Sequence, residues 1–321
     1  MKLHVIAVAA VLAIAGVVAY KALGRADAAV TPQSPPKTAE RRIIATDGAL
    51  TEIVYALGFG KEIVAADLTA KWPLDATKKP SIGYVRRLSA EGILSLSPTL
   101  VINNADAGPA EVIDQLRAAG LKFHDVPGEK MARSFPAILQ RIRSVAAALG
   151  VPEKGELLAA DVEADLGAVR KAVSGRKGVK TLFLFNPTME KVTAAGKGTG
   201  ADEFMKLVGL QNVAGNLESW KPLTQESIVD LAPELLIATS NRDSHNQFTT
   251  VDELLTIHGL ARTPAGKSRH VIFVDSSKFL SGGPRVGLMA IEFAKMVYPD
   301  LAFPRSRSAD WFSEVEKQFN E

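Results

Sequence analysis

A helix–strand unit that occurs twice constrains the fold of this chain more than any other feature. The segment from Leu88 to Ile102 matches the segment from Leu223 to Ile237, and Leu, Glu, Ile, Leu, Pro, Leu and Ile fall in the same places in both copies. In each copy a Pro ends a short helix and an apolar strand follows. The repetition predicts two lobes that share a scaffold. The residues that have no counterpart in the second copy are then the candidates for the function of this protein.

Strands alternate with helices in both halves of the 321-residue chain. This order predicts an α/β fold of two Rossmann-like lobes with parallel sheets and right-handed crossovers. Between the halves, a helix from about Glu153 to Val173 has a narrow apolar stripe, which suits a helix that lies across two bodies. A ligand cleft between the lobes is expected, because ligands of open α/β sheets bind beyond the carboxyl ends of the strands. The expected boundaries are an N-terminal lobe over 41–150, a connecting helix over 151–177, a C-terminal lobe over 178–300 and a tail over 301–321.

The N-terminus has the pattern of a targeting segment. Lys2 precedes an apolar run from Val5 to Val18, and Ala26-Asp27-Ala28 is an A-x-A cleavage signal. The run is shorter than the roughly 20 residues of a membrane-spanning helix. We therefore favour a cleaved signal peptide over 1–28 above a retained anchor, and we expect a periplasmic protein that begins near Ala29. Such a location argues against ATP and NAD as cofactors.

Composition excludes several kinds of site. The chain has no Cys, which rules out disulfides, thiolate metal ligands, Cys nucleophiles and a lipid-modified Cys at the end of the leader. The 38 basic and 35 acidic residues are spread along the chain, so a nucleic-acid partner is not expected. There is no G-x-S-x-G motif, and Gly196–Gly200 lacks the first Gly of a phosphate loop. We expect a binding protein and not an enzyme, with an extracytoplasmic enzyme as the second class.

An insertion distinguishes the first lobe from the second. The interval from Gly58 to Leu88 is much longer than the equivalent interval from Gly209 to Leu223, and the extra residues include Trp72 and Tyr84. An insertion at the mouth of the cleft is a candidate for ligand binding. The alternative for Tyr84 is a ring that packs on a turn, and the alternative for Trp72 is packing on the neighbouring Pro.

Three motifs carry a resemblance to a known family. The chain from 41 to 299 resembles the helical-spine substrate-binding proteins of bacterial ABC importers, which take up cobalamin, ferric siderophores and haem. The motifs most similar to the haem-binding branch are Gly83–Gly92, Ala195–Asp202 and Trp220–Leu223. This resemblance implies a periplasmic, monomeric protein that carries ferric haem to an ABC permease dimer and its ATPase. Cobalamin or a ferric siderophore is the alternative ligand.

The resemblance also implies roles for individual residues. Tyr84, in Gly-Tyr-x-Arg, is the implied iron ligand and Arg86 its support; a phenolate suits ferric iron, and a nearby guanidinium favours the ionised phenol. Some members add a His ligand from the other lobe, but 186–191 contains no His, so a second ligand or second haem is not expected. Trp72 could stack on the macrocycle. Arg242 could pair with a haem propionate, or it could be a solvated loop residue.

Glu91 and Glu226 occupy equal places in the two repeated units. The resemblance implies that they dock onto the permease dimer. They could also be ordinary first-turn residues, because the N-terminus of a helix favours negative charge. The four histidines at 124, 245, 258 and 270 have no metal-ligand spacing, and a structural role is expected for them.

Overall fold

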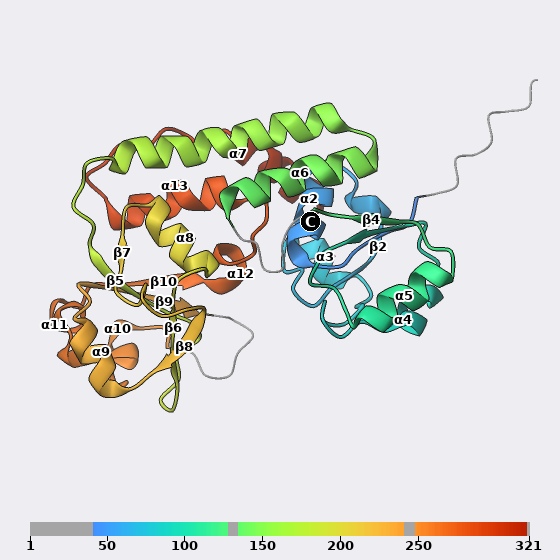
Figure 1. Ribbon diagram of the computed structural model, residues 1–321. Helices are drawn as coiled ribbons and strands as arrows, with labels where there is room; N and C mark the ends of the chain where they lie inside the picture. Colours follow the sequence, from blue (N-terminus) through green and yellow to red (C-terminus); the bar gives the residue numbers. More distant parts are fainter. Residues whose placement is uncertain (1–40, 128–133, 241–247, 320–321) are drawn as a thin grey trace, which may run out of the picture. The chain divides into compact units, whose positions relative to one another are not determined.

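The computed structural model of the protein describes residues 41–127, 134–240 and 248–319. The predicted signal peptide and two of the residues considered above, Arg242 and His245, lie outside these ranges. The described chain has the predicted α/β fold, with two sheets and the helices that connect their strands (Figure 1). Within these ranges no helix is both long and apolar enough to cross a membrane.

The first sheet is fully parallel, as predicted. Its strand order is β2-β1-β3-β4, and every neighbouring pair in that order runs parallel. Its two central strands, β1 and β3, are buried along their whole length, whereas the edge strand β4 is partly exposed. The strands are β1 (Ile43–Ala45), β2 (Ile63–Ala66), β3 (Leu100–Asn103) and β4 (Phe123–Asp125). The connecting helices are α2 (Gly48–Ala56), α3 (Leu74–Lys78), α4 (Ala90–Ser95) and α5 (Ala110–Ala118).

The second sheet is mixed, which corrects the prediction of a parallel sheet. Its order is β10-β9-β5-β6-β8 with β7 beside β5; β5, β7, β9 and β10 pair in parallel, but β6 pairs antiparallel with β5 and β8. The strands are β5 (Lys180–Leu184), β6 (Val192–Ala195), β7 (Gln211–Asn212), β8 (Trp220–Leu223), β9 (Leu235–Ser240) and β10 (Val271–Asp275). The helices among them are α8 (Gly200–Leu207), α9 (Gln225–Leu231), α10 (Val251–Leu255), α11 (Pro264–Ser268) and α12 (Ser276–Phe279).

A long helix joins the two halves where the sequence predicts it. This helix, α7 (Pro152–Val173), follows α6 (Phe135–Leu149) and packs along both α6 and α13 (Val286–Val297) (Figure 1). All five residues of the predicted stripe are buried: Leu158, Val162, Leu166, Val169 and Val173. A Cβ on Gly155 would lie 2.3 Å from the Cβ of Ala146, so this glycine permits the close approach of α6 and α7.

The end of the chain returns to the first half of the molecule. Helix α14 (Ala309–Phe319) lies within the tail, and the ring of Phe319 meets that of Tyr55 of α2 edge to face, with 4.9 Å between the ring centres. Asp165 of α7 is buried and accepts hydrogen bonds from the backbone amides of Arg307 and Ser308 and from the hydroxyls of Ser306 and Ser308. These bonds satisfy a buried carboxylate and fix the residues that lead into α14.

Candidate functional site

Tyr84 lies on a loop beyond the carboxyl edge of the first sheet. Gly83, which precedes it, has a φ of +84°, a conformation that favours glycine. The carbonyl of Gly83 accepts from the amide of Leu68, just after β2, at 2.9 Å. On the other side, the carbonyl of Val85 accepts from the amide of Gly108, which follows β3, also at 2.9 Å. The loop is therefore attached to the connections that follow two parallel strands, which is the edge where ligands bind in such sheets.

The side chain of Tyr84 is available to a ligand. It is 40% exposed, one of few large apolar or aromatic side chains in the described chain with that much surface. The amide of Arg87 donates to the carbonyl of Tyr84 at 2.7 Å and closes a turn over residues 84–87. Backbone bonds thus hold the loop while the phenol remains in solvent.

Arg86 is placed beside an acidic residue of the neighbouring connection. One guanidinium nitrogen lies 3.8 Å from a carboxylate oxygen of Asp106, and the Arg86 side chain is about half exposed. An ion pair of this length and exposure contributes little to stability, but it limits where the guanidinium can lie. Arg86 therefore places a positive charge on the same short turn as Tyr84.

Buried Asp67 lies next to the Tyr84 loop and was not among the residues predicted for the site. Its carboxylate accepts from the backbone amide of Thr69 at 2.6 Å and from the Thr69 hydroxyl. Burial raises the pKa of the Asp67 carboxyl, while the hydrogen bonds from Thr69 and the Val85 amide act in the opposite direction. The Asp67 carboxylate therefore holds the turn that follows β2 through Thr69, and its second oxygen is buried without a hydrogen-bond partner.

Glu91 and Glu226 occupy equivalent positions, as their repetition predicts. Ser89 caps α4 by accepting from the amide of Gly92 at 3.2 Å, and Thr224 caps α9 by accepting from the amide of Ser227 at 3.3 Å. Each Glu is then the second residue of its helix, and both are exposed. Hydrogen bonds from its own backbone amide and from the Thr224 hydroxyl hold the pKa of Glu226 below its ordinary value. Each of these short helices therefore presents one exposed carboxylate in its first turn.

Trp72 lies in the core and not on the surface expected to meet a ligand. Its side chain is 8% exposed, its ring meets Phe312 of α14 at 5.8 Å, and its indole N–H donates to Glu316 at 3.2 Å. These contacts occupy the indole with protein groups. The structure thus gives Trp72 the packing role that the sequence left open, with α14 as a partner in place of the neighbouring Pro alone.

A buried ion pair lies next to Trp72 and was missed in the sequence. Arg285, at the N-cap of α13, donates to both carboxylate oxygens of Glu52 on α2, at 2.6 and 3.0 Å. Both side chains are at most 5% exposed, and the guanidinium lies 4.7 Å from the Trp72 ring centre. Burial raises the pKa of the Glu52 carboxyl, and the charge of Arg285 opposes that rise. The pair joins α2, in the N-terminal half of the chain, to the start of α13, in the C-terminal half.

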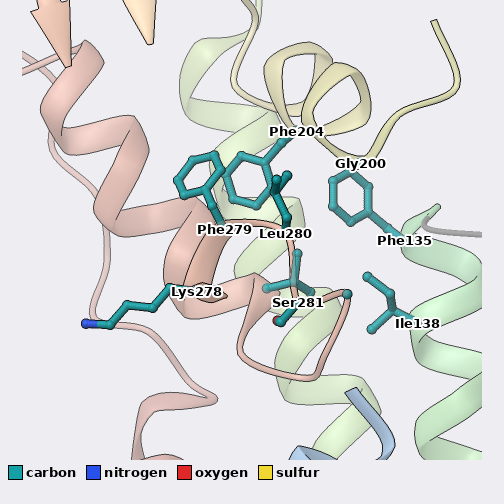
Figure 2. A pocket seen from close by; sticks show the side chains of 10 residues that line it. Phe135, Ile138, Gly200, Phe204, Lys278, Phe279, Leu280 and Ser281 are labelled. Atoms are coloured by element: carbon teal, nitrogen blue, oxygen red, sulfur yellow. The ribbon is translucent and has the colours of Figure 1, made fainter. Parts of the chain in front are cut away.

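An aromatic pocket is lined by residues of α6, α8, α12 and α13 and by the loop between α12 and α13. Its enclosed volume is about 20 Å³, room for about one water molecule and too little for a small-molecule ligand. Figure 2 shows the rings of Phe135, Phe204 and Phe279 grouped at the pocket, while the side chain of Lys278 extends away from them. Tyr84 does not line this pocket, so the structure does not bring the two together. Among the described residues, no three His, Asp or Glu side chains form a group that could hold a metal ion.

Comparison with known families decides the family of the chain. The family model described as periplasmic binding protein matches residues 43–277, more than half of the sequence. The chain belongs to the periplasmic binding protein family. This family is a group of binding proteins, and membership indicates an extracytoplasmic location.

Solved structures similar to this periplasmic binding protein include two that are named for haem. The periplasmic heme-binding protein RhuT from Roseiflexus sp. RS-1, in apo form, is 40% identical with a TM-score of 0.72, over 81% of this chain and 98% of that one. The periplasmic heme-binding protein BhuT, solved with two hemes, is 31% identical with a TM-score of 0.73, over 85% and 99%.

Curated relatives extend the comparison to other ligands. The uncharacterized ABC transporter substrate-binding lipoprotein YvrC of Bacillus subtilis is 26% identical over 84% of this chain and 83% of its own. The vitamin B12-binding protein of Pectobacterium atrosepticum is 23% identical over 78% of this chain and 86% of its own. The relatives of this periplasmic binding protein therefore include more than one ligand class.

Proposed function

We propose that this periplasmic binding protein binds ferric haem and delivers it to the permease of an ABC importer. Tyr84 carries the proposal, because it presents a half-exposed phenol on an anchored loop at the ligand-binding edge of a parallel sheet. Ferric iron accepts a phenolate, and Tyr is an established haem ligand. The haem-binding names of the two similar structures, RhuT and BhuT, support the same ligand. The protein acts as a carrier, so no reaction is assigned to it.

Two arginines complete the proposed site. Arg86 places a positive charge on the short turn that carries Tyr84, beside Asp106. Arg242 pairs with a haem propionate through its forked guanidinium, a geometry suited to carboxylates. We leave Trp72 out of the site, since its ring is covered by Phe312 and Arg285.

Glu91 and Glu226 are the proposed contacts with the permease. They are exposed, and they stand at the same position in two equivalent helices. A dimeric permease presents two equivalent surfaces, so a monomeric binding protein with two equivalent carboxylates could meet both. An ATPase bound to the permease would then drive import, as expected for a relative of an ABC transporter substrate-binding protein.

We also propose that the N-terminal leader is cleaved and that the mature protein is periplasmic. The leader is cut after Ala28, so the mature protein begins at Ala29 in the periplasm. Its proposed parts are an N-terminal lobe over 41–150, a connecting helix over 151–177, a C-terminal lobe over 178–300 and a tail over 301–321. The motive is the A-x-A signal after the apolar run. Mass spectrometry of periplasmic material would give the mature N-terminus. Recovery of an uncut leader in the membrane fraction would contradict cleavage.

A titration with three ligands tests the proposed function. Purified apo-protein is mixed with ferric haem, with cobalamin and with a ferric siderophore, and binding is followed by absorbance and by calorimetry. The proposal predicts a saturable Soret shift with haem and no comparable affinity for the other two. Cobalamin is the second candidate, favoured by the vitamin B12-binding relatives. Saturable cobalamin binding without a haem response would replace the proposal by that candidate.

A further inference from the structure

Leu68 is a large apolar side chain held in solvent next to the Tyr84 loop. It is 55% exposed, and it occupies the second position of a turn that the amide of Ala70 closes on the carbonyl of Asp67 at 3.0 Å. Turns of this kind usually carry Gly, Pro, Asn, Asp or Ser. A single exposed leucine needs no explanation by itself, so what matters is how this one is held.

Contacts with α2 fix the turn that carries Leu68. The hydroxyl of Thr69 accepts from the amide of Gly48 at 2.9 Å and donates to buried Asp67. A Cβ on Gly48 would lie 2.4 Å from the carbonyl oxygen of Thr69, so the turn is pressed against the first residue of the helix. Contact with Gly48 therefore prevents the turn from moving toward the protein interior, and Leu68 stays exposed.

The same turn is bonded directly to the residue before Tyr84. The amide of Leu68 donates to the carbonyl of Gly83 at 2.9 Å, and the amide of Ile82 donates to the carbonyl of Ala66 at 3.0 Å. Two adjacent stretches of backbone thus carry two exposed side chains, Leu68 and Tyr84, on a rigid support. Their closeness comes from the fold, because the insertion returns to the end of β2 before it reaches Tyr84.

We propose that Leu68 is a second ligand-contacting residue of the Tyr84 site, where it packs against the apolar periphery of the porphyrin. The inference rests on the proposed function, since a macrocycle ligated at its central iron extends over the surface around that ligand. The porphyrin edge is hydrocarbon, and covering an exposed leucine with it removes apolar surface from water. Leu68 would then select for a flat apolar ring in addition to the iron that Tyr84 binds.

Three variants test this role by haem titration. Leu68→Ala removes most of the side chain, Leu68→Met keeps its apolar area, and Leu157→Ala is a matched control, because Leu157 is 62% exposed on α7. We expect Leu68→Ala to weaken haem binding about fivefold to tenfold, the loss that partial burial of a leucine side chain corresponds to. Leu68→Met and Leu157→Ala should bind as the wild type does. The phenolate-to-iron band should persist in all three, since Tyr84 is untouched.

The outcomes separate this inference from the function on which it rests. If the wild type binds haem and Leu68→Ala binds equally well, the contact is wrong and the proposed function stands. If Leu68→Ala loses the phenolate-to-iron band, Leu68 shapes the Tyr84 loop and does not contact the ring, which also overturns the inference. If the wild type binds no haem, both the proposed function and the Leu68 contact fail. Equal denaturation midpoints for the variants exclude unfolding as the cause of a loss.

Discussion

The buried pair of Glu52 and Arg285 should be costly to break from one side. The change Glu52→Gln keeps the shape of the side chain but leaves the guanidinium of Arg285 buried without a counter-charge. The two hydrogen bonds of the pair are 2.6 and 3.0 Å long, and neither side chain is more than 5% exposed. Removing one partner of such a pair costs about 3–5 kcal/mol. That is a large share of the roughly 5–15 kcal/mol by which proteins are stable.

Urea denaturation measures this cost. With a slope of about 3 kcal/mol per molar, Glu52→Gln should lower the midpoint by roughly 1–1.7 M. The matched control is Glu156→Gln, which breaks the pair between Arg143 of α6 and Glu156 of α7, 2.9 Å apart but 41% and 62% exposed. An exposed pair contributes no more than about 1 kcal/mol, so the control should shift the midpoint far less.

A double variant separates the pair from its burial. Replacing both Glu52 and Arg285 by Met leaves no uncompensated charge, so it should recover much of the stability lost in Glu52→Gln. Equal losses of unfolding free energy for Glu52→Gln and Glu156→Gln would refute the reasoning, because breaking the buried pair of Glu52 and Arg285 would then cost no more than breaking an exposed pair. A double variant worse than Glu52→Gln would do the same.

Two further predictions concern exposed and buried carboxylates. Changing Glu91 and Glu226 together to Ala should leave haem titrations unchanged while haem-dependent growth collapses. Each single change should reduce growth less, and changing both residues to Arg should reduce it more, because Arg adds repulsion. Normal growth of the double Ala variant would remove the docking role. Burial raises the pKa of the Asp67 carboxyl in the folded state, so the wild type should lose stability as the pH rises from about 4 to 7 and the carboxyl ionises. Asp67→Asn has no such carboxyl, and its stability relative to the wild type should therefore rise over the same range. Thermal melts of both proteins across that range check the sign, and a constant difference between them would contradict it.

Features whose signals are local in sequence were predictable. The repeated unit forms two equivalent helices because Ser89 and Thr224 cap them from within the same few residues. Thr250 and Glu253 form a capping box at the start of α10, and both residues of that signal lie within four positions of the chain. The stripe on α7 predicted its buried face, because 3.6-residue periodicity needs no knowledge of the partner.

Features that depend on distant partners were not predictable. The antiparallel pairing of β6 with β8 was not predicted. Pro222 lies in β8, which is an edge strand, where proline is tolerated. The positions of Trp72 and Glu52 depend on Glu316 and Arg285, which are 244 and 233 residues away. Asp67 and Leu68 show no motif, and only the folded turn gives them a place beside Tyr84.

The most direct test of the central claim is a ferric haem titration of Tyr84→Phe. Tyr298→Phe is the control, because it also removes one phenol oxygen, from a ring that is 5% exposed. The account predicts that the wild type and Tyr298→Phe show a phenolate-to-iron charge-transfer band, and that Tyr84→Phe lacks it and binds haem more weakly. An unchanged spectrum and affinity in Tyr84→Phe would contradict the assignment of Tyr84 as the iron ligand.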